Sequence, residues 1–286
     1  ETANGAVAEI LHADGTRSER ACDILVGADG IHSALRQQFH PDEGAPRWNG
    51  MMMWRGTTLA RPFLDGRTMV QAGHRRAKFV VYPIEPVRPD GLQRINWICD
   101  RRLREDGFGG GLTAPSREDW SKPGSLDDLL PTFGSWRFAW LDVPGLIRAA
   151  EQILEWPMVD RDPLPRWRHG HTTLLGDAAH PMYPIGSNGA TQAILDAAAL
   201  ADALDGHASI TAALNAYEAA RLPMTRDIVA MNRREGLDAI LDMVEEAAPE
   251  GFARIEDVTD PTVLAEWVQA YKKAAGHQVG RPQSAP

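Results

Sequence analysis

The sequence is poor in cysteine, in positive charge and in long apolar runs. Its 286 residues include two cysteines, Cys22 and Cys99, far apart in apolar stretches. We interpret them as buried, reduced thiols rather than as a disulfide or a metal site. No run of about 18 apolar residues occurs, so no membrane span is expected. Asp and Glu outnumber Lys and Arg by 39 to 30, and this net charge of −9 argues against nucleic-acid binding.

These absences leave a globular protein whose partners are small molecules or proteins. Hydrophobic residues make up 43% of the chain and charged residues 24%, which are ordinary values. The length allows one large domain or two modest ones. The first residues lack a basic segment followed by an apolar one, so they do not form a signal peptide. We expect a cytoplasmic location.

Hydrophobic periodicity predicts an α/β mixture. Residues 6–26 indicate two strands joined by an Asp14-Gly15 turn. Residues 48–101 are rich in β-branched, Met and aromatic residues, interrupted by Gly, Pro and Asp, which predicts an antiparallel sheet. After Gly189 the pattern is helical. Apolar residues at helical spacing form the face that we expect to pack against a sheet: Ile194, Ala197, Ala198, Ala201 and Leu204.

The first motif that carries chemistry is "DILVGADGIHSALRQQF", residues 23–39. An apolar strand ends in small residues and a helix follows. In open α/β sheets, ligands such as nucleotides bind at this end of the strands. Asp29 can accept a hydrogen bond from a hydroxyl, and Arg36 can pair with a phosphate or with Asp29. A surface turn with an Asp-Gly tip is the alternative interpretation.

The second motif is "LLGDAAHPMYPIGSNGATQAI", residues 174–194. Gly176 permits close backbone approach, and Asp177 at the end of a strand suits a sugar or ribitol hydroxyl. The helix that follows offers free N–H groups and a dipole that favour negative charge. A helix capped by Asn188 is the alternative. It does not explain why Asp, His, Pro and Gly are so dense here.

Together these stretches resemble the Asp-Gly and Gly-Asp motifs of the single-component flavoprotein aromatic hydroxylases, the class A or para-hydroxybenzoate hydroxylase type. Their order and the helix that follows agree, and the similarity runs over nearly the entire chain. The stretches "MWRGTTLARPFLDGRTM", "YPI", "INWICD" and "LEWPMVDRDPLPRW" resemble, more narrowly, members of this family that modify phenazines.

The resemblance implies FAD as cofactor, NAD(P)H and O2 as co-substrates, and hydroxylation of a small aromatic ring through a flavin C4a-hydroperoxide. It also implies the domain organisation. Residues 1–45 and 156–206 would be parts of a Rossmann-like FAD-binding domain, residues 46–155 an antiparallel-sheet substrate domain, and residues 207–286 a C-terminal helical segment.

The same resemblance implies roles for the motif residues. Asp177 would hold the ribitol, while Asp29 and Gly30 would lie near the pyrophosphate and the nicotinamide donor. Pro184 would lie beside the reacting edge of the flavin. His180 would tune the flavin or contact the substrate, with a structural His bound to loop backbone as the alternative. The other candidates for cofactor binding are Arg36, Gly176, Gly186, Asn188, Gly189, Ala190 and Thr191, of which the last two would turn their amides to the flavin pyrimidine.

The substrate pocket is expected to draw on strands and on the Gly-Asp loop. Arg55 can meet a carboxylate with two hydrogen bonds, which fits an aromatic acid. For each candidate an ordinary position in the sheet core is an equal alternative. The candidates are Met53, Arg55, Tyr82, Trp97, Met182 and Tyr183. The sequence contains neither a Ser-His-Asp set nor a cluster with metal-ligand spacing, so hydrolytic and metal chemistry have little support.

One family feature is missing. The Gly-x-Gly-x-x-Gly fingerprint and the acidic residue that follows it do not occur. "DGFGGG" at 106–111 does not supply it, because Leu112 stands where the third Gly is required. The chain opens inside a predicted hairpin, so we expect it to be the C-terminal part of a longer protein. An exposed apolar sheet edge would then favour association, including association with the missing N-terminal segment.

Three functions remain open from the sequence. The first is an FAD-dependent aromatic hydroxylase seen as a truncated or split chain. The second is a catalytically inactive fragment that acts as a binding or assembly module. The third is an FAD-linked reductase or epoxidase of the same superfamily that acts on isoprenoids.

Overall fold

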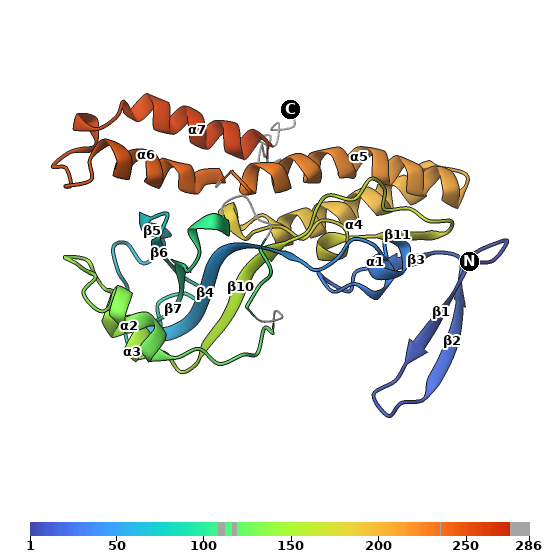
Figure 1. The fold of residues 1–286 in the computed structure, drawn as a ribbon, viewed down its shortest axis with the longest axis horizontal. Helices are drawn as coiled ribbons and strands as arrows, with labels where there is room; N and C mark the ends of the chain where they lie inside the picture. The colour runs from blue at the N-terminus through green and yellow to red at the C-terminus, as the bar shows by residue number, and fades with distance from the viewer. Residues whose placement is uncertain (108–111, 116–118, 235, 275–286) are drawn as a thin grey trace. The chain divides into compact units, whose positions relative to one another are not determined.

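The computed structural model describes residues 1–107, 112–115, 119–234 and 236–274. Most of the Gly-rich stretch 106–111 lies outside these ranges. The chain has a mixed α/β fold, as predicted, and divides into two compact units (Figure 1). Unit 1 comprises residues 1–47, 160–237 and the chain from residue 260 onward; unit 2 comprises residues 48–159 and 238–259.

Unit 1 begins with an antiparallel hairpin. Strands β1 (Ala6–Leu11) and β2 (Arg17–Cys22) pair along their whole length. The turn contains Gly15 at a φ of +82°, and the Asp14 carboxylate accepts the N–H of Thr16 at 2.9 Å. This conformation favours glycine, because a Cβ is disfavoured at positive φ. The predicted Asp-Gly hairpin is therefore confirmed, but its second strand ends at Cys22, and Leu25–Gly27 forms a separate strand in another sheet.

Two short parallel strands carry the motifs. Strand β3 (Leu25–Gly27) pairs with β11 (Thr172–Leu174), and helix α1 (Ala34–Phe39) follows β3. Gly27 lies opposite Leu174. A Cβ on Gly27 would lie 2.9 Å from Leu174 Cδ2 and 3.0 Å from Leu35 Cδ1. A side chain at this position would therefore require Leu174 and Leu35 to shift.

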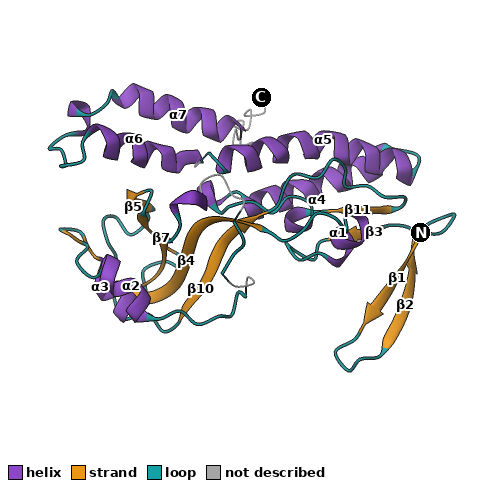
Figure 2. Cartoon of the chain, in the orientation of Figure 1, coloured by secondary structure: helices purple, strands orange, loops and turns teal. Residues whose placement is uncertain are grey.

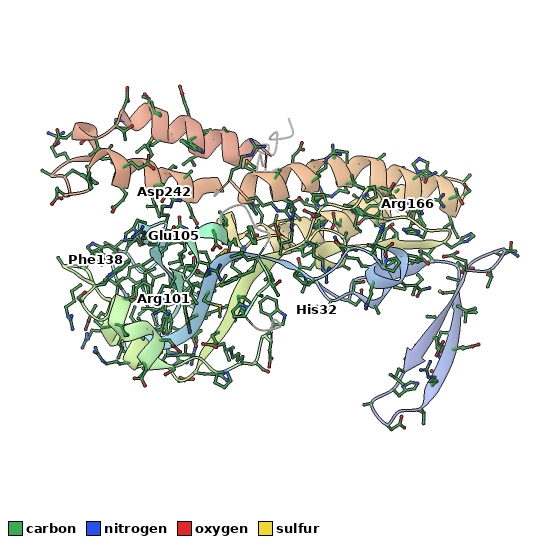
Figure 3. All side chains as sticks on the ribbon, viewed as in Figure 1. His32, Arg101, Glu105, Phe138, Arg166 and Asp242 are labelled. Carbon is green, nitrogen blue, oxygen red and sulfur yellow. The ribbon has the colours of Figure 1, made fainter. Side chains whose placement is uncertain are left out.

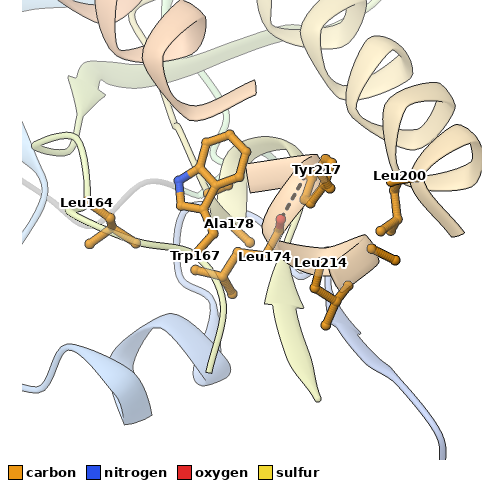
Figure 4. Close-up of a cluster of buried hydrophobic side chains, with 10 residues drawn as sticks. Leu164, Trp167, Leu174, Ala178, Leu200, Leu214 and Tyr217 are labelled. Carbon is orange, nitrogen blue, oxygen red and sulfur yellow. Dashed lines mark hydrogen bonds between the residues drawn. The ribbon is translucent and has the colours of Figure 1, made fainter. Parts of the chain in front are cut away.

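Helices α4 (Gly189–Gly206) and α5 (Ile210–Asn232) pack against each other, and both contribute to a buried cluster that contains Leu174 of β11. The Tyr217 hydroxyl donates a 3.0 Å hydrogen bond to the carbonyl of Leu174, so the buried phenol remains satisfied (Figure 4). The buried core of this region includes Leu164, Trp167, Leu174, Ala178, Leu200, Leu214 and Tyr217.

The structure corrects the packing face of α4. Its buried side chains are Gln192, Asp196, Leu200 and Ala203. The apolar stripe that was predicted to pack is exposed in the described residues: Ile194 has 70% of its surface accessible and Leu204 has 37%. The reason is that α5 packs against the polar side of α4, where Asp196 and Gln192 find buried partners on α5.

Unit 2 is built on a five-stranded sheet with the order β10-β4-β7-β6-β5 (Figure 2). Strand β4 pairs antiparallel with β7, β7 with β6, and β6 with β5. The predicted antiparallel sheet is confirmed. The strands are β4 (Arg47–Ala60), β5 (Val70–His74), β6 (Ala77–Pro83), β7 (Gln93–Arg102) and β10 (Ile153–Asp160).

The two faces of this sheet differ in character, because side chains alternate along each strand. One face carries Phe79 and Trp97, whose rings lie 6.2 Å apart, and is covered by helices α2 (Leu126–Phe133) and α3 (Val143–Arg148). Arg101, labelled in Figure 3, lies on this covered face, 5.3 Å above the Trp54 ring. The opposite face carries Lys78, Asn96 and Arg55, and we call it the polar face.

The remaining elements are short strands and C-terminal helices. Strands β8 (Arg137–Phe138) and β9 (Leu141–Asp142) form a small hairpin. Helix α6 (Ala239–Ala247) packs against β5 in unit 2, where Asp242 accepts the N–H of Arg75 at 3.0 Å. Helix α7 (Pro261–Ala274) contacts α5 in unit 1. Of the helices in the described ranges, none has the length and hydropathy that crossing a membrane requires.

Candidate functional site

The two motifs meet at one edge of unit 1. Because β3 and β11 run parallel, the loops that follow them leave from the same end, and the N–H of Leu175 donates to the carbonyl of Gly27 at 2.9 Å. Asp29 is exposed, and its carboxylate accepts the N–H of Ala34 at 2.7 Å. Gly30 has a φ of +79°. Strand pairing therefore brings the Asp-Gly and Gly-Asp motifs side by side.

Asp177 is an exposed carboxylate at the end of β11. It lies in the short 3₁₀ helix Gly176–Ala178, and no hydrogen bond reaches its side chain from the residues that the structure describes. Gly176 has a φ of +60°. A Cβ on Gly189 would lie 3.8 Å from Asp177 Oδ1, so the carboxylate stands beside the first residue of α4. Both groups border the same space.

The start of α4 has no side-chain cap. Asn188 is fully buried, and its side chain makes no capping hydrogen bond, so the capped-helix alternative is wrong. The loop before it places Gly186 at φ +72° and Ser187 at φ +56°; a non-glycine residue in this region is strained, and such strain gathers at functional sites. The first-turn N–H groups, those of Gly189 to Thr191, have no acceptor in the described chain.

His180 faces away from this edge, into the core. It is 3% exposed, and its Nε2 lies 2.5 Å from Asp196 Oδ2. Asp196 also accepts the N–H of Gly176 at 3.0 Å and Nε of Arg221 at 2.7 Å. Burial raises the pKa of the Asp196 carboxyl, but the hydrogen bonds from His180, Arg221 and Gly176 outweigh it and lower that pKa. His180 thus joins the loop to α4 through a side chain, not through loop backbone.

Arg36 has partners other than those expected. It is 1% exposed and pairs with Glu43 through Nε, at 2.8 Å, and through Nη2. Its other donors bind the carbonyls of Ala178 at 3.1 Å, Ala179 at 2.8 Å and Asp162 at 2.8 Å. All five N–H groups of the guanidinium are then used. The expectation that Arg36 pairs with a phosphate or with Asp29 is corrected: it ties the Gly-Asp loop to α1.

The loop residues that were expected to contact the substrate differ in their solvent exposure. Pro184 is exposed. Met182 packs with Ile228 and Val229 in a buried cluster. Tyr183 is 1% exposed, its carbonyl accepts Nδ2 of Asn232 at 3.0 Å, and burial raises the pKa of its phenol. Within unit 1, therefore, Met182 and Tyr183 hold the loop in the core, which is the alternative that the sequence left open for them.

The strand candidates lie in unit 2 on different faces of the sheet. Arg55 and Tyr82 belong to the polar face, where Tyr82 is paired with Asn96 across the strands. Met53 shares that face but is 3% exposed. Trp97 lies on the opposite, covered face, fully buried, and donates to the hydroxyl of Thr58 at 3.1 Å. The grouping of Trp97 with Arg55 is corrected by the register.

Sequence reasoning missed two kinds of residue. Asp196 and Arg221 hold the Gly-Asp loop from behind, and a signal for Asp196 was present: it is a lone carboxylate on the helical face of Leu200. Asn96 on the polar face gave no local signal, because its partner, Arg55, lies on another strand. The described residues contain no group of three or more His, Cys, Asp or Glu placed to hold a metal ion.

Comparisons with known proteins identify relatives of this chain. The "FAD binding domain" family matches residues 144–232. The phenazine 1,6-dicarboxylic acid hydroxylase PhzS of Lysobacter antibioticus is 49% identical over 211 residues, which are 73% of this chain and 50% of that protein. The 3-amino-4-hydroxybenzoate 2-monooxygenase PtmB3 of Streptomyces platensis is 38% identical over 229 residues, 78% of this chain and 52% of its own length.

Solved structures show the same fold. The crystal structure of Klebsiella pneumoniae HpxO complexed with FAD and uric acid has a TM-score of 0.65 and 24% identity, over 96% of this chain and 60% of that one. The chain spans about half the length of the curated relatives it matches. Three findings therefore support one family: the relatives are aromatic-ring hydroxylases, an FAD-binding family model matches, and the fold is shared. This chain belongs to the class A FAD-dependent aromatic hydroxylases.

Proposed function

We propose that the chain carries the flavin-ring end and the substrate sheet of an FAD-dependent monooxygenase. The enzyme would hydroxylate a small aromatic acid with NAD(P)H as electron donor and O2 as oxidant. The observation that carries this proposal is the exposed Asp177 carboxylate beside the uncapped start of α4. Such a pair offers an acceptor for a ribitol hydroxyl next to donors for the carbonyl oxygens of a ring.

The residues at this edge fit a flavin. A Cβ on Gly189 would meet only Asp177 Oδ1, at 3.8 Å, so the backbone beside the carboxylate is open to close approach. A Cβ on Gly176 would instead meet Ala193 of α4 at 3.2 Å, so this glycine allows the loop to pack on the helix. The amides of Ala190 and Thr191 would face the flavin pyrimidine, where a helix N-terminus stabilises negative charge. When bound, FAD would accept hydride from NAD(P)H and activate O2.

Other residues of the chain would orient the ring rather than react. Arg36 and Asp196 hold the Gly-Asp loop from inside, so its backbone is positioned before any ligand arrives. Pro184 would border the reacting edge as an apolar, exposed group that excludes water. Asp29 and Gly30 would lie toward the pyrophosphate and the nicotinamide donor. His180 would act as a support of the loop, because its ring is buried against Asp196.

The polar face of unit 2 supports the proposed substrate class. Arg55 is exposed and its nearest partner is a neutral amide, so its charge is available for a carboxylate. The sequence resembles 5-methylphenazine-1-carboxylate 1-monooxygenase, and the relative PhzS is named for a phenazine dicarboxylic acid. We infer a phenazine-like carboxylic acid. An isoprenoid hydrocarbon has no anionic group, so the guanidinium would not strengthen its binding.

Association is the second candidate property. Sheet β3–β11 has two strands in the described residues, and Val26 and Ile194 expose 37% and 70% of their surfaces. An apolar helix stripe and an unpaired strand edge favour burial against further strands. We propose that a segment with the Gly-x-Gly-x-x-Gly fingerprint pairs here. An inactive assembly module remains the alternative that this surface supports.

A flavin titration tests the proposal. With the protein from its intact gene, FAD is expected to bind and Asp177→Ala is expected to lower flavin retention sharply, because an acceptor for the ribitol is lost. Asp205→Ala, at the far end of α4, is the matched control and is expected to retain flavin. The visible absorption spectrum after gel filtration reports both. Full flavin content in Asp177→Ala would refute the role of that carboxylate.

A substrate comparison separates the alternatives. NAD(P)H oxidation is expected to rise with phenazine-1,6-dicarboxylate and not with isoprenoid lipids. Stimulation by lipids alone would overturn the hydroxylase proposal. A protein that shows neither flavin bands with added FAD nor any NAD(P)H oxidation would instead be an assembly module.

A further inference from the structure

Arg55 is tethered at one atom only. Its Nε donates a 2.7 Å hydrogen bond to Oδ1 of Asn96, which lies on the neighbouring strand β7 and is fully buried. The orientation of the amide is determined by chemistry, because a guanidinium N–H requires an oxygen and the amide nitrogen is a donor. In the described residues no other side chain binds the Arg55 guanidinium. Its two Nη groups, with four N–H donors, are therefore available.

The cationic side chains on the polar face have different partners. Lys78 lies 3.1 Å from Asp100 and also pairs with Asp238. Arg94 lies 3.4 Å from Glu151. On the same face, therefore, Lys78 and Arg94 have carboxylate partners, whereas Arg55 has a neutral amide. Asparagine at position 96 holds the guanidinium in place without neutralising it.

Asn96 carries a polar atom that no group in the described chain satisfies. Its Nδ2 is buried and has no hydrogen-bond partner in the described chain. A buried amide donor without a partner costs about 1–3 kcal/mol. Polar groups that remain unsatisfied in a core call for an explanation other than stability. The tether on Arg55 supplies one.

We propose that Asn96 is a positioning residue that presents Arg55 end-on to a substrate carboxylate and so selects aromatic acids. A carboxylate can pair with the Nε–Nη edge of a guanidinium or with its Nη–Nη end. Asn96 occupies the first, so the acid binds through the second. The inference rests on the proposed function, because it assumes an aromatic acid as the ligand of Arg55.

Binding of two matched rings tests this inference. The flavin-loaded protein is titrated calorimetrically with phenazine-1,6-dicarboxylate and with unsubstituted phenazine. Asn96→Asp keeps the shape and the acceptor but pairs the charge of Arg55. It is expected to weaken binding of the acid by roughly 10- to 100-fold, the range of one charged hydrogen bond, and to leave phenazine unchanged. Asn96→Leu removes the hydrogen bond that holds the guanidinium and is expected to weaken binding of the acid by roughly 2- to 10-fold.

The control is Thr57→Val, which changes the residue paired directly with Asn96 on β4. It is expected to bind both rings as the unaltered protein does. Unaltered binding of phenazine by either Asn96 variant also shows that it is folded, and Asn96→Leu decides the matter should Asn96→Asp fail to fold.

The outcomes separate the two proposals. An unaltered protein that binds phenazine as well as the dicarboxylate overturns the aromatic-acid proposal and this inference with it. An unaltered protein that prefers the acid, with Asn96 variants that keep the same preference, overturns only the positioning role of Asn96.

Discussion

Unit 1 and unit 2 each bury charged side chains, but the hydrogen bonds of these side chains differ between the units. In unit 1, both oxygens of Asp196 and all five donors of Arg36 have partners, and the partners include the backbone of the Gly-Asp loop. On the polar face of unit 2, Asp100 Oδ1 and Asn96 Nδ2 have none in the described chain. In the Asp196 network both carboxylate oxygens are satisfied, although Nδ1 of His180 also has no partner in the described chain. Hydrogen bonds from several sides specify one geometry, whereas a buried atom without a partner calls for an explanation other than stability.

The contrast also shows in how the groups ionise. Burial lowers the pKa of Lys78, but the carboxylates of Asp100 and Asp238 outweigh it and raise that pKa. Burial and the neighbouring Asp238 raise the pKa of Asp100. Two carboxylates share one ammonium, so one of them is held less firmly as an anion. Asp196, with three donors of its own, has a lowered pKa.

The largest effect is expected for Asp196→Ala. The change leaves Arg221 buried without its carboxylate and removes the acceptors of His180 and Gly176. Unit 1 is expected to lose about 3–5 kcal/mol of its free energy of unfolding, measured by urea denaturation. Asp202→Ala, exposed on the same helix, is expected to change it by less than about 0.5 kcal/mol. Equal losses in the two variants would contradict the network.

A smaller effect is expected for Lys78→Met. It leaves Asp100 buried without a cation, but Asp238 at the start of α6 can turn to water. We expect a loss of about 2–3 kcal/mol in unit 2. The control is Arg76→Met, whose pair with Glu105 is exposed and is expected to contribute at most about 1 kcal/mol. If Lys78→Met proved the more damaging of the two network variants, the contrast between the units would fail.

Gly27→Ala tests the junction of the two motifs. The added methyl group would meet Leu174 and Leu35 at 2.9 and 3.0 Å, so overpacking is expected to cost about 1–3 kcal/mol. Gly206→Ala at the end of α4 meets nothing within 4 Å and is expected to be nearly neutral. Thermal denaturation of both variants makes the comparison. A neutral Gly27→Ala would show that β3 and β11 adapt to added volume.

The smallest effect is expected from pH and is confined to unit 1. Burial, helped by Arg36, lowers the pKa of His40 below 6.5, and burial, helped by Arg166, does the same for His169. The unfolded chain therefore takes up protons first. The contribution of these two histidines to the free energy of unfolding is expected to decrease as pH falls from about 6.5 toward their folded pKa values, and to be constant above about pH 7.5. Asp160, whose pKa burial raises to about 6, contributes with the opposite sign as it is protonated.

Denaturation across this pH window is the measurement. His169→Phe preserves a stack on Phe39, whose ring lies 4.0 Å from that of His169, but cannot titrate. It is expected to flatten the pH dependence. His12→Gln in the exposed part of the β1–β2 hairpin should leave the slope as it is. A pH dependence that is the same in His169→Phe and in the unaltered protein would contradict the role assigned to His169.

Much of the site was predictable because it is local in sequence. Asp29, Gly176 and Asp177 stand where an apolar strand gives way to small residues, and pattern alone locates such positions. The partners of Arg36 could not be predicted, because the carbonyls of Ala178 and Ala179 lie more than 140 positions away along the chain. The buried face of α4 was misread for the same reason: Asp196 is polar, and only a distant arginine makes its burial favourable.

The sequence by itself determined the α/β class, the two motifs and the kinship with flavin-dependent hydroxylases, because strands, turns and helix starts depend on neighbouring residues. The tertiary structure decided which side chains act together. Strand register placed Trp97 in the covered core and Asn96 beside Arg55, one position apart on the same strand. Because successive side chains of a strand point to opposite faces, that single position separates a residue of the covered core from one that binds the Arg55 guanidinium.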